Sequence, residues 1–471
     1  MNPPQPPPLP PKPAYAPDPR YAASAASPAA AQWHYAPRRR PAPWHSRTAR
    51  AIALFSLLAL SGVIILAMVR QQTGTQGFLV GLGLAVFPVP VLIAGFCWLD
   101  RIDPEPRRNL VFAFAWGACA ATLVALLANG LATNWLENNL STLSPDDAQT
   151  WGATVFAPVI EETVKAAAVV LLFLFRRQNF AGVTDGLVLA GITATGFAFT
   201  ENILYLGNAF GQDQSLGHTG LDSLTAGTFF VRIIMSPFAH PLFTMLTGLA
   251  FGIAATSYPH RRPLRLALPF LGLATAVLLH AIWNAATTLG DLGFLTVYGL
   301  FMLPVFAALT WLAVWARHRE LLALRTYLPP YVTTGWLSPT EPISLSSLKT
   351  RSVARDIARR TQGPTAARAV TEYAATATTL AFLRRQAHRT GPTPTFPTQE
   401  QALLHHLWQH KPVAHPALLQ ALHTTHRPLY TPQGPPSPMA PSSATRIPPI
   451  PQYAPDPSGH RPPHGGSPPA A

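Results

Sequence analysis

Eight long apolar segments constrain the fold of this chain more than any other feature of its sequence. From about Ala51 to Ala316 the chain is almost continuously apolar, with short polar connections. Each segment can cross a hydrocarbon core of about 30 Å as a helix rising about 1.5 Å per residue. The sequence therefore predicts an all-α fold, a polytopic membrane helix bundle. The predicted spans are Ala51–Val69, Phe78–Leu99, Asn109–Ala132, Trp151–Phe175, Val183–Leu206, Phe229–Thr256, Leu264–Leu289 and Leu292–Ala316.

The charges of the connecting loops orient these spans. Arginines lie before the first span, in alternate connections, and after the last span. The other connections, Gln71–Gly77, Thr133–Thr150 and Leu206–Thr228, contain no Lys or Arg. Because Lys and Arg are enriched in cytoplasmic loops, this pattern predicts a multi-pass protein of the cell membrane with both termini in the cytoplasm.

The flanks of the apolar region have a different composition. Many of the 51 prolines lie near the two ends of the chain, which predicts disordered tails at 1–47 and 427–471. Between them we expect a transmembrane domain at 48–317 and a small cytoplasmic helical region at 318–426. That region holds amphipathic stretches such as Leu345–Thr361, Ala366–His388 and Gln399–Trp408. Its His405, His406 and His410 are interpreted as a solvated helix face in preference to a metal site.

Charge and cysteine content exclude other classes of function. The net charge of +14 would suggest a nucleic-acid partner in a soluble protein. Here the arginines lie beside apolar segments, so membrane topology explains much of the excess and we expect no nucleic-acid partner. The two cysteines, Cys97 and Cys119, both fall within predicted spans. They form neither a disulfide framework nor a C-x-x-C motif.

Ionisable residues inside four successive spans mark a candidate functional site. A charge at a helix centre costs about 2.5–3.5 kcal/mol on insertion, whereas an apolar residue returns only about 0.3–0.6 kcal/mol. The predicted topology places these residues at a similar depth, in the outer half of the bilayer. We therefore expect one shared polar site. Its members are Glu161, Glu162 and Lys165 in the fourth span, Glu201 in the fifth, His240 in the sixth, and His280 with Asn284 in the seventh.

The spacing in the fourth span allows two interpretations. Lys165 follows Glu161 by four residues and Glu162 by three, so it can reach both carboxylates on the helix surface. One carboxylate could activate water, with its neighbours setting its charge. Alternatively, the three groups form an ion pair that only eases insertion.

Helical spacing also groups residues in the fifth and seventh spans. Phe197, Glu201 and Tyr205 recur every four residues and share one helix face. A structural role would be a hydrogen bond between helices, but an Asn would serve that role at lower cost, so a functional Glu201 is favoured. His280 and Asn284 lie one turn apart and allow the same two interpretations.

Prolines surround the histidine of the sixth span. His240 lies between Pro237 and Pro241, which predicts a broken or kinked helix at this point. Arg232 lies two turns earlier and could pair with one of the glutamates. A single His on an apolar face is more often a hydrogen-bonded core residue than a ligand.

Other intramembrane protease signatures are missing from the sequence. There is no H-E-x-x-H motif of a zinc protease and no G-x-S-x-G nucleophile elbow. Asp185 and Asp291 lie near opposite membrane faces, so they are poorly placed to form an aspartyl dyad.

Taken in order, the four motifs resemble those of the PrsW family of intramembrane proteases, which is related to the CAAX prenyl endopeptidases. The resemblance covers roughly Asn109 to Ala316. It implies an endopeptidase, a hydrolase that cuts a membrane-anchored protein substrate at the lipid bilayer. In one lineage of the family that substrate is an anti-sigma factor. The matching motifs are Glu161-Glu162-x-x-Lys165, Phe197-x-x-x-Glu201-Asn202 with Tyr205, His240 with Gly248, and His280-x-x-x-Asn284.

The resemblance also implies roles for these residues. A glutamate of the pair would activate water with help from a His, and His280 with Asn284 would stabilise the oxyanion. Glu201, His240 and His280 are chemically adequate Zn²⁺ ligands that would leave a position open for water. A metal-free Glu–His pair is the alternative. Two other classes of function stay open, a proton-coupled transporter or channel and a catalytically inactive receptor or scaffold.

Overall fold

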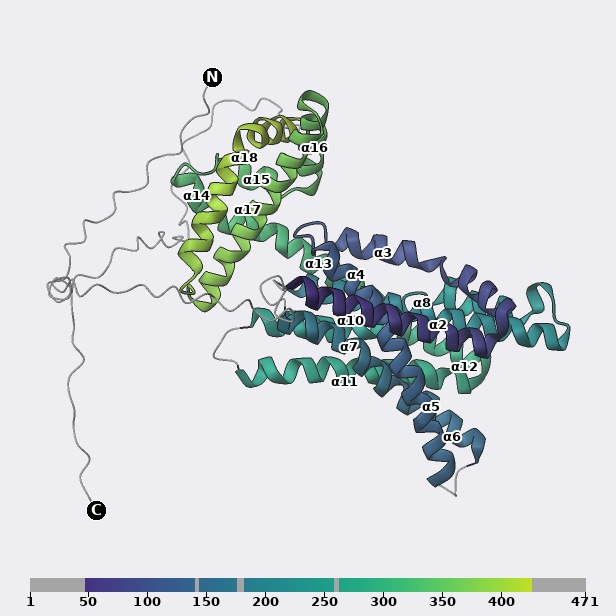
Figure 1. Cartoon of the computed structure of the whole chain (residues 1–471). Coiled ribbons are helices and arrows are strands. Elements are labelled where there is room, and N and C mark those ends of the chain that lie inside the picture. Colours follow the sequence, from purple (N-terminus) through teal and green to yellow (C-terminus); the bar gives the residue numbers. More distant parts are fainter. Residues whose placement is uncertain (1–46, 140–143, 176–181, 258–261, 426–471) are drawn as a thin grey trace, which may run out of the picture.

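The protein is almost entirely helical in the computed structural model, which describes residues 47–139, 144–175, 182–257 and 262–425 (Figure 1). No strand occurs in these ranges, as the sequence predicted. The two predicted Pro-rich tails lie outside the described residues, except for Arg47, which begins α2.

The elements follow one another as α-helices interrupted by short 3₁₀ and π segments, labelled η. The apolar part contains α2 Arg47–Ala85, α3 Pro88–Leu99, α4 Arg107–Ala115, η3 Trp116–Ala121, α5 Thr122–Asn139, α6 Pro145–Trp151, η4 Gly152–Phe156, α7 Ala157–Phe175, α8 Val183–Leu216, η5 Gly220–Asp222, α9 Leu224–Phe229, η6 Phe230–Met235, α10 Ala239–Thr256, α11 Arg262–Ala286, η7 Thr287–Leu289, α12 Gly290–Val297, η8 Tyr298–Met302 and α13 Leu303–Tyr327. The rest, which we call the C-terminal bundle, contains α14 Pro329–Thr333, α15 Glu341–Leu345, α16 Leu348–Gln362, α17 Pro364–Thr390 and α18 Phe396–Thr425.

Five helical stretches of the described residues are long and apolar enough to cross a membrane. The first, Thr48–Leu99, contains two of the predicted spans, with Gly74 between them at a φ of 71°. The last, Arg262–Thr333, also contains two, with Gly290 between them at a φ of 70°. Positive φ ends regular helix and is readily adopted by Gly. The predicted span Trp151–Phe175 is helical too, but it contains too many charged residues to qualify as a membrane-crossing helix by apolarity alone. Eight crossings and cytoplasmic termini stay predictions.

Helix α8 is the centre of the apolar part. Its most apolar stretch is 83% buried, whereas the corresponding stretches of Thr48–Leu99 and Arg262–Thr333 are 17% and 11% buried. The helices packed around α8 include α2, α4, α7 and α10. The outer helices therefore present their apolar side chains outward, as expected for lipid contact, and α8 is enclosed by protein.

Small residues let α8 and α10 approach closely. A Cβ atom on Gly248 of α10 would lie 2.1 Å from the carbonyl oxygen of Gly186 on α8, and one on Gly186 would meet the carbonyl oxygen of Gly248 at 2.0 Å. Only glycine fits at such a crossing, which is a common way for membrane helices to pack. Gly248, part of the third motif, thus sets the spacing between the helices that carry Glu201 and His240.

The C-terminal bundle has its own hydrophobic core and is joined to the apolar part by α13 (Figure 1). Tyr373 and Leu380 of α17 and Leu418 of α18 are buried in this core. A second, smaller cluster connects the two parts, because Phe382 packs with Ala323 of α13 and with Ile102, which lies between α3 and α4.

Two acidic side chains are buried beside this junction, outside the predicted spans. Asp100 is 4% exposed and Glu105 is 6% exposed. The backbone N–H of Glu105 donates to Asp100 Oδ2 at 2.9 Å, and Asn109 Nδ2 donates to Glu105 Oε2 at 2.7 Å. Burial raises the pKa of Asp100 to about 8 and that of Glu105 to about 7, because it disfavours the charged carboxylate.

These raised pKa values predict that stability falls as the pH rises toward 8. The folded state favours the protonated carboxyls, so their contribution is complete below the ordinary pKa values of 3.8 and 4.5 and is lost as the pH rises through the folded values of about 7 and 8. We expect the melting temperature of the detergent-solubilised protein to decrease from pH 6 to pH 9. The Asp100→Asn variant should lose part of this decrease, whereas Asp146→Asn, which changes an exposed carboxylate, should keep all of it. Equal pH dependence in both variants would contradict the assignment.

The crossing of α8 and α10 predicts a strong effect of side-chain size. Gly248→Val must push α10 away from α8, and overpacking of this kind costs about 1–3 kcal/mol. We expect a lower melting temperature. Gly83→Val on α2 is the matched control, because a Cβ at Gly83 meets nothing within 4 Å. Similar melting temperatures for the two variants would disprove the close approach of α8 and α10.

Candidate active site

Residues from four helices meet at one place inside the apolar part. The sixth span is broken before His240, as predicted: η6 ends at Met235, and α10 begins at Ala239. His240 therefore lies in the first turn of a new helix. The residues that meet are Glu161, Glu162 and Lys165 from α7, Glu201 from α8, His240 from α10 and His280 from α11.

Lys165 lies at the centre of these contacts and is fully buried. Its Nζ lies 3.3 Å from Glu161 Oε2, 2.9 Å from Glu162 Oε1 and 3.0 Å from His240 Nδ1. The ammonium also lies 3.9 Å from the ring centroid of Phe197, a cation–π distance. Since an ammonium only donates, His240 must accept at Nδ1 and carry its proton at Nε2.

Glu162 is surrounded by hydrogen-bond partners. Its Oε1 contacts Lys165 Nζ and lies 3.0 Å from His280 Nδ1, while its Oε2 accepts from Thr244 Oγ1 at 2.8 Å. The side chain has no solvent exposure. This carboxylate orients His280: a proton on Nδ1 donated to Glu162 leaves a lone pair on Nε2.

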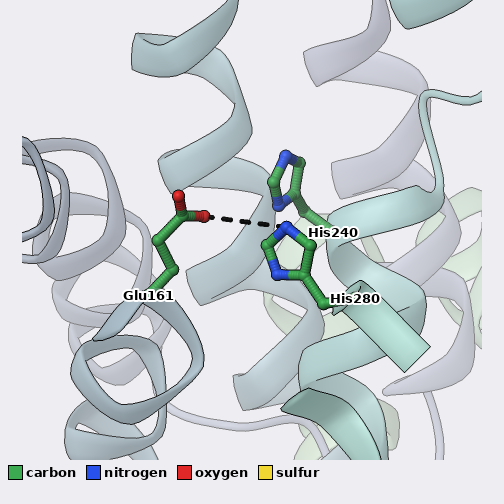
Figure 2. Close-up of side chains that lie close together, drawn as sticks. All are labelled: Glu161, His240 and His280. Carbon is green, nitrogen blue, oxygen red and sulfur yellow. Dashed lines mark ion pairs between the residues drawn. The ribbon is translucent and has the colours of Figure 1, made fainter. Parts of the chain in front are cut away.

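Glu161 has looser contacts than its neighbour. Its Oε1 lies 3.4 Å from Asn129 Nδ2, and its Oε2 lies 3.9 Å from His280 Nε2, the pair drawn in Figure 2. Glu161 lines a cavity of about 430 Å³, whereas Glu162 and Lys165 do not. The two adjacent glutamates thus differ: one faces the cavity and the other lies behind it.

The cavity wall carries most of the other predicted residues. Glu201, His240, His280 and Asn284 all line it. Asn284 has a separate partner, because its Nδ2 donates to the carbonyl oxygen of Ala153 in η4 at 2.8 Å. Asn284 is thus held beside the cavity and links α11 to η4, without a bond to the glutamate pair.

A second ion-pair network holds His240 from the other side. His240 Nε2 lies 2.7 Å from Glu201 Oε2, which also accepts a hydrogen bond from Arg232. Arg232 donates to Asn202 Oδ1 at 2.8 Å and stacks 3.9 Å from the ring centroid of Tyr205. The second motif therefore acts as a unit, in which Asn202 and Tyr205 position the arginine that neutralises Glu201.

Two residues that contact the glutamate pair were not predicted from the sequence. Thr244 lies one turn after His240, and its helical spacing could have identified it. Asn129 lies in the third span, far along the chain from every motif. Only the packing of α5 against α7 brings it to Glu161, so no local signal pointed to it.

Glu161, His240 and His280 form a candidate metal-ligand set (Figure 2). They offer ligand atoms that all lie within 4.8 Å of one another. Two imidazoles and one carboxylate suit zinc. Glu201, which the sequence suggested as the third ligand, is engaged by Arg232 and His240 instead. Its role as a ligand stays a prediction.

The position of Lys165 opposes a cation among these ligands. A zinc ion bound to Glu161 Oε2 at about 2.0–2.2 Å would lie within roughly 5.5 Å of the ammonium, which is 3.3 Å from the same oxygen. Both nitrogens of His240 are already in contact with partners, Lys165 at Nδ1 and Glu201 at Nε2. Like charges this close in a buried site repel strongly. The donor types fit zinc, but their present arrangement does not.

Comparisons with known proteins point to one family. Residues 105–309 match the model of the PrsW family intramembrane metalloprotease. The chain is 26% identical over 200 residues to Protease PrsW of Clostridioides difficile (strain 630), a match that covers 42% of this chain and 75% of the relative. It is 27% identical over 179 residues to Protease PrsW of Geobacillus kaustophilus (strain HTA426), covering 38% of this chain and 68% of the relative. No solved structure matches. With the motifs in order and these matches over the same region, residues 105–309 are similar to the PrsW family of intramembrane proteases.

Proposed function

We propose that this protein is an endopeptidase that hydrolyses a peptide bond of a membrane-anchored protein substrate, with Glu161 as the base that activates water. The observation that carries this proposal is the difference between the adjacent glutamates. Glu161 faces the cavity with long contacts, whereas Glu162 is enclosed by Lys165, His280 and Thr244. A base must reach its water, and only Glu161 has the room to do so.

The surrounding residues support this role. The positive charge of Lys165 favours the ionised form of Glu161, the form that can accept a proton from water. His280 presents Nε2 toward Glu161 because Glu162 holds its Nδ1. Glu162 is thus a positioning residue that acts through His280. The proton that Glu161 accepts would pass to the leaving amine when the peptide bond breaks.

His280 and Asn284 are the proposed oxyanion donors, and both line the cavity. In this role the His280 ring would be protonated on both nitrogens, so that Nδ1 donates to Glu162 and Nε2 donates to the oxyanion. In this role they would stabilise the negative charge that develops on the carbonyl oxygen after water attacks. A regulatory membrane protein such as an anti-sigma factor belongs to the proposed substrate class.

Zinc, where bound, would lower the pKa of a water molecule and polarise the carbonyl group. The family is described as one of metalloproteases. We nevertheless propose metal-free hydrolysis, because the Lys165 ammonium already contacts two of the three candidate ligands.

One prediction concerns the base. Glu161→Gln keeps the size of the side chain but cannot accept the proton, so we expect kcat for a membrane-anchored reporter in proteoliposomes to fall about 10²–10⁴-fold. Glu137→Gln, an exposed carboxylate at the end of α5, is the matched control and should cleave as the unmodified protein does. Normal cleavage by Glu161→Gln would disprove the proposed role.

The positioning role of Glu162 gives a different expectation. Glu162→Gln weakens the hydrogen bond that orients His280, and the loss of such a partner lowers activity by about 10–100-fold. We expect this loss in kcat with KM unchanged, and partial recovery in Glu162→Asp, which restores the carboxylate. A melting temperature measured alongside separates this effect from unfolding. If Glu162→Gln loses more activity than Glu161→Gln, the assignment of the pair is reversed.

Metal removal tests the choice between the two chemistries. We expect cleavage to survive dialysis against a chelator that strips zinc from the protein, as measured by elemental analysis of the assayed sample. Activity that disappears on stripping and returns with zinc alone would show that the metal-free proposal is wrong.

A further inference from the structure

A second cluster of metal-ligating side chains lies on the C-terminal bundle, far along the chain from the candidate active site. It joins Glu372 of α17 to His406 and His410 of α18. The ligand atoms of these three residues all lie within 4.8 Å of one another. We propose that this cluster, which we call the α17–α18 site, binds a divalent transition-metal ion of the zinc class.

The helical spacing of the histidines suits a chelate. His406 and His410 are four residues apart, so they lie one above the other on the same face of α18. Their ring centroids are 4.7 Å apart. Glu372 approaches from the neighbouring helix, with its Oε2 3.1 Å from His410 Nε2. Two imidazoles and a carboxylate are ligands that zinc accepts, and they would leave one position open.

A neighbouring hydroxyl orients one of the ligands. Thr376, one turn after Glu372 on α17, lies with its Oγ1 3.0 Å from His406 Nδ1. This contact leaves Nε2 as the nitrogen available to bind. Partners of this kind fix the ring orientation of metal-ligating histidines.

Charge and access also favour an ion here. The nearest basic residue along the chain, Lys411, points elsewhere: its Nζ donates to the carbonyl oxygen of Trp336 at 2.7 Å. Glu372 and His406 are exposed and His410 is partly exposed, so an ion can enter from solvent. The α17–α18 site therefore differs from the candidate active site, where Lys165 contacts the ligands.

The adjacent His405 provides a matched control. Its Nδ1 contacts the carbonyl oxygen of Gln401 at 3.0 Å, and its ring packs edge-on against Trp336 at a centroid distance of 6.1 Å. His405 is also a histidine on α18, but it takes no part in the α17–α18 site.

The ligand types indicate which metals the α17–α18 site would select. Imidazole ligands favour zinc, nickel and copper over magnesium and calcium.

The test uses the full-length protein in detergent, stripped with a chelator and then equilibrated with micromolar free Zn²⁺. Elemental analysis gives the zinc bound per chain. We expect His406→Ala, His410→Ala and Glu372→Gln each to bind one zinc ion fewer than the unmodified chain, and His405→Ala to bind the same number. Because the result is a difference between variants, it does not depend on whether the active site holds zinc.

Two further measurements complete the test. Because the substituted side chains are mostly exposed, all variants should melt at the same temperature without metal. Zn²⁺ should then raise the melting temperature of the unmodified protein and of His405→Ala more than that of His406→Ala. Equal zinc binding by the unmodified chain and His406→Ala would overturn the proposal, and so would competition by an equal concentration of Mg²⁺.

Discussion

The buried ammonium of Lys165 is the interaction on which the rest of the site depends. It is fully buried, and it contacts Glu161 and Glu162 on its own helix and His240 on α10. An uncompensated charge at this depth would be very costly, so the two carboxylates and the lysine must occur together. The contact with His240 also fixes which of its nitrogens carries the proton. One cation thus contacts both glutamates and sets the tautomer of a histidine from another helix.

The helix packing makes this network geometrically feasible. Enclosed by its neighbours, α8 approaches α10 through Gly186 and Gly248 without intervening side chains. The short distance between the backbones brings Glu201 of α8 within 2.7 Å of His240 on α10. A glycine in the third motif therefore allows the close packing of the two helices that carry these charged motifs.

Several features could be predicted because they depend on the local spacing of residues along the chain. Helical periodicity placed Lys165 within reach of both glutamates, and the prolines around His240 indicated the break before α10. Other features depended on long-range packing. Helix α18 continues through Pro412 and Pro416 to Thr425, well beyond the stretch predicted to end at Trp408. Buried Ala414, Ala417 and Leu418 anchor this part of α18 in the C-terminal core, which outweighs the lost hydrogen bonds.

The sequence by itself determined the class of apolar helical membrane protein, the likeness to the PrsW family and the set of charged residues, because hydropathy and motif order are properties of the linear chain. Only the tertiary structure decided which of the adjacent glutamates faces the cavity. Neighbours in sequence point in different directions on a helix, and the packing of α10 and α11 enclosed Glu162 and left Glu161 at the cavity. The same reason explains the α17–α18 site: the pairing of two helices brought Glu372 to His406 and His410 and excluded His405.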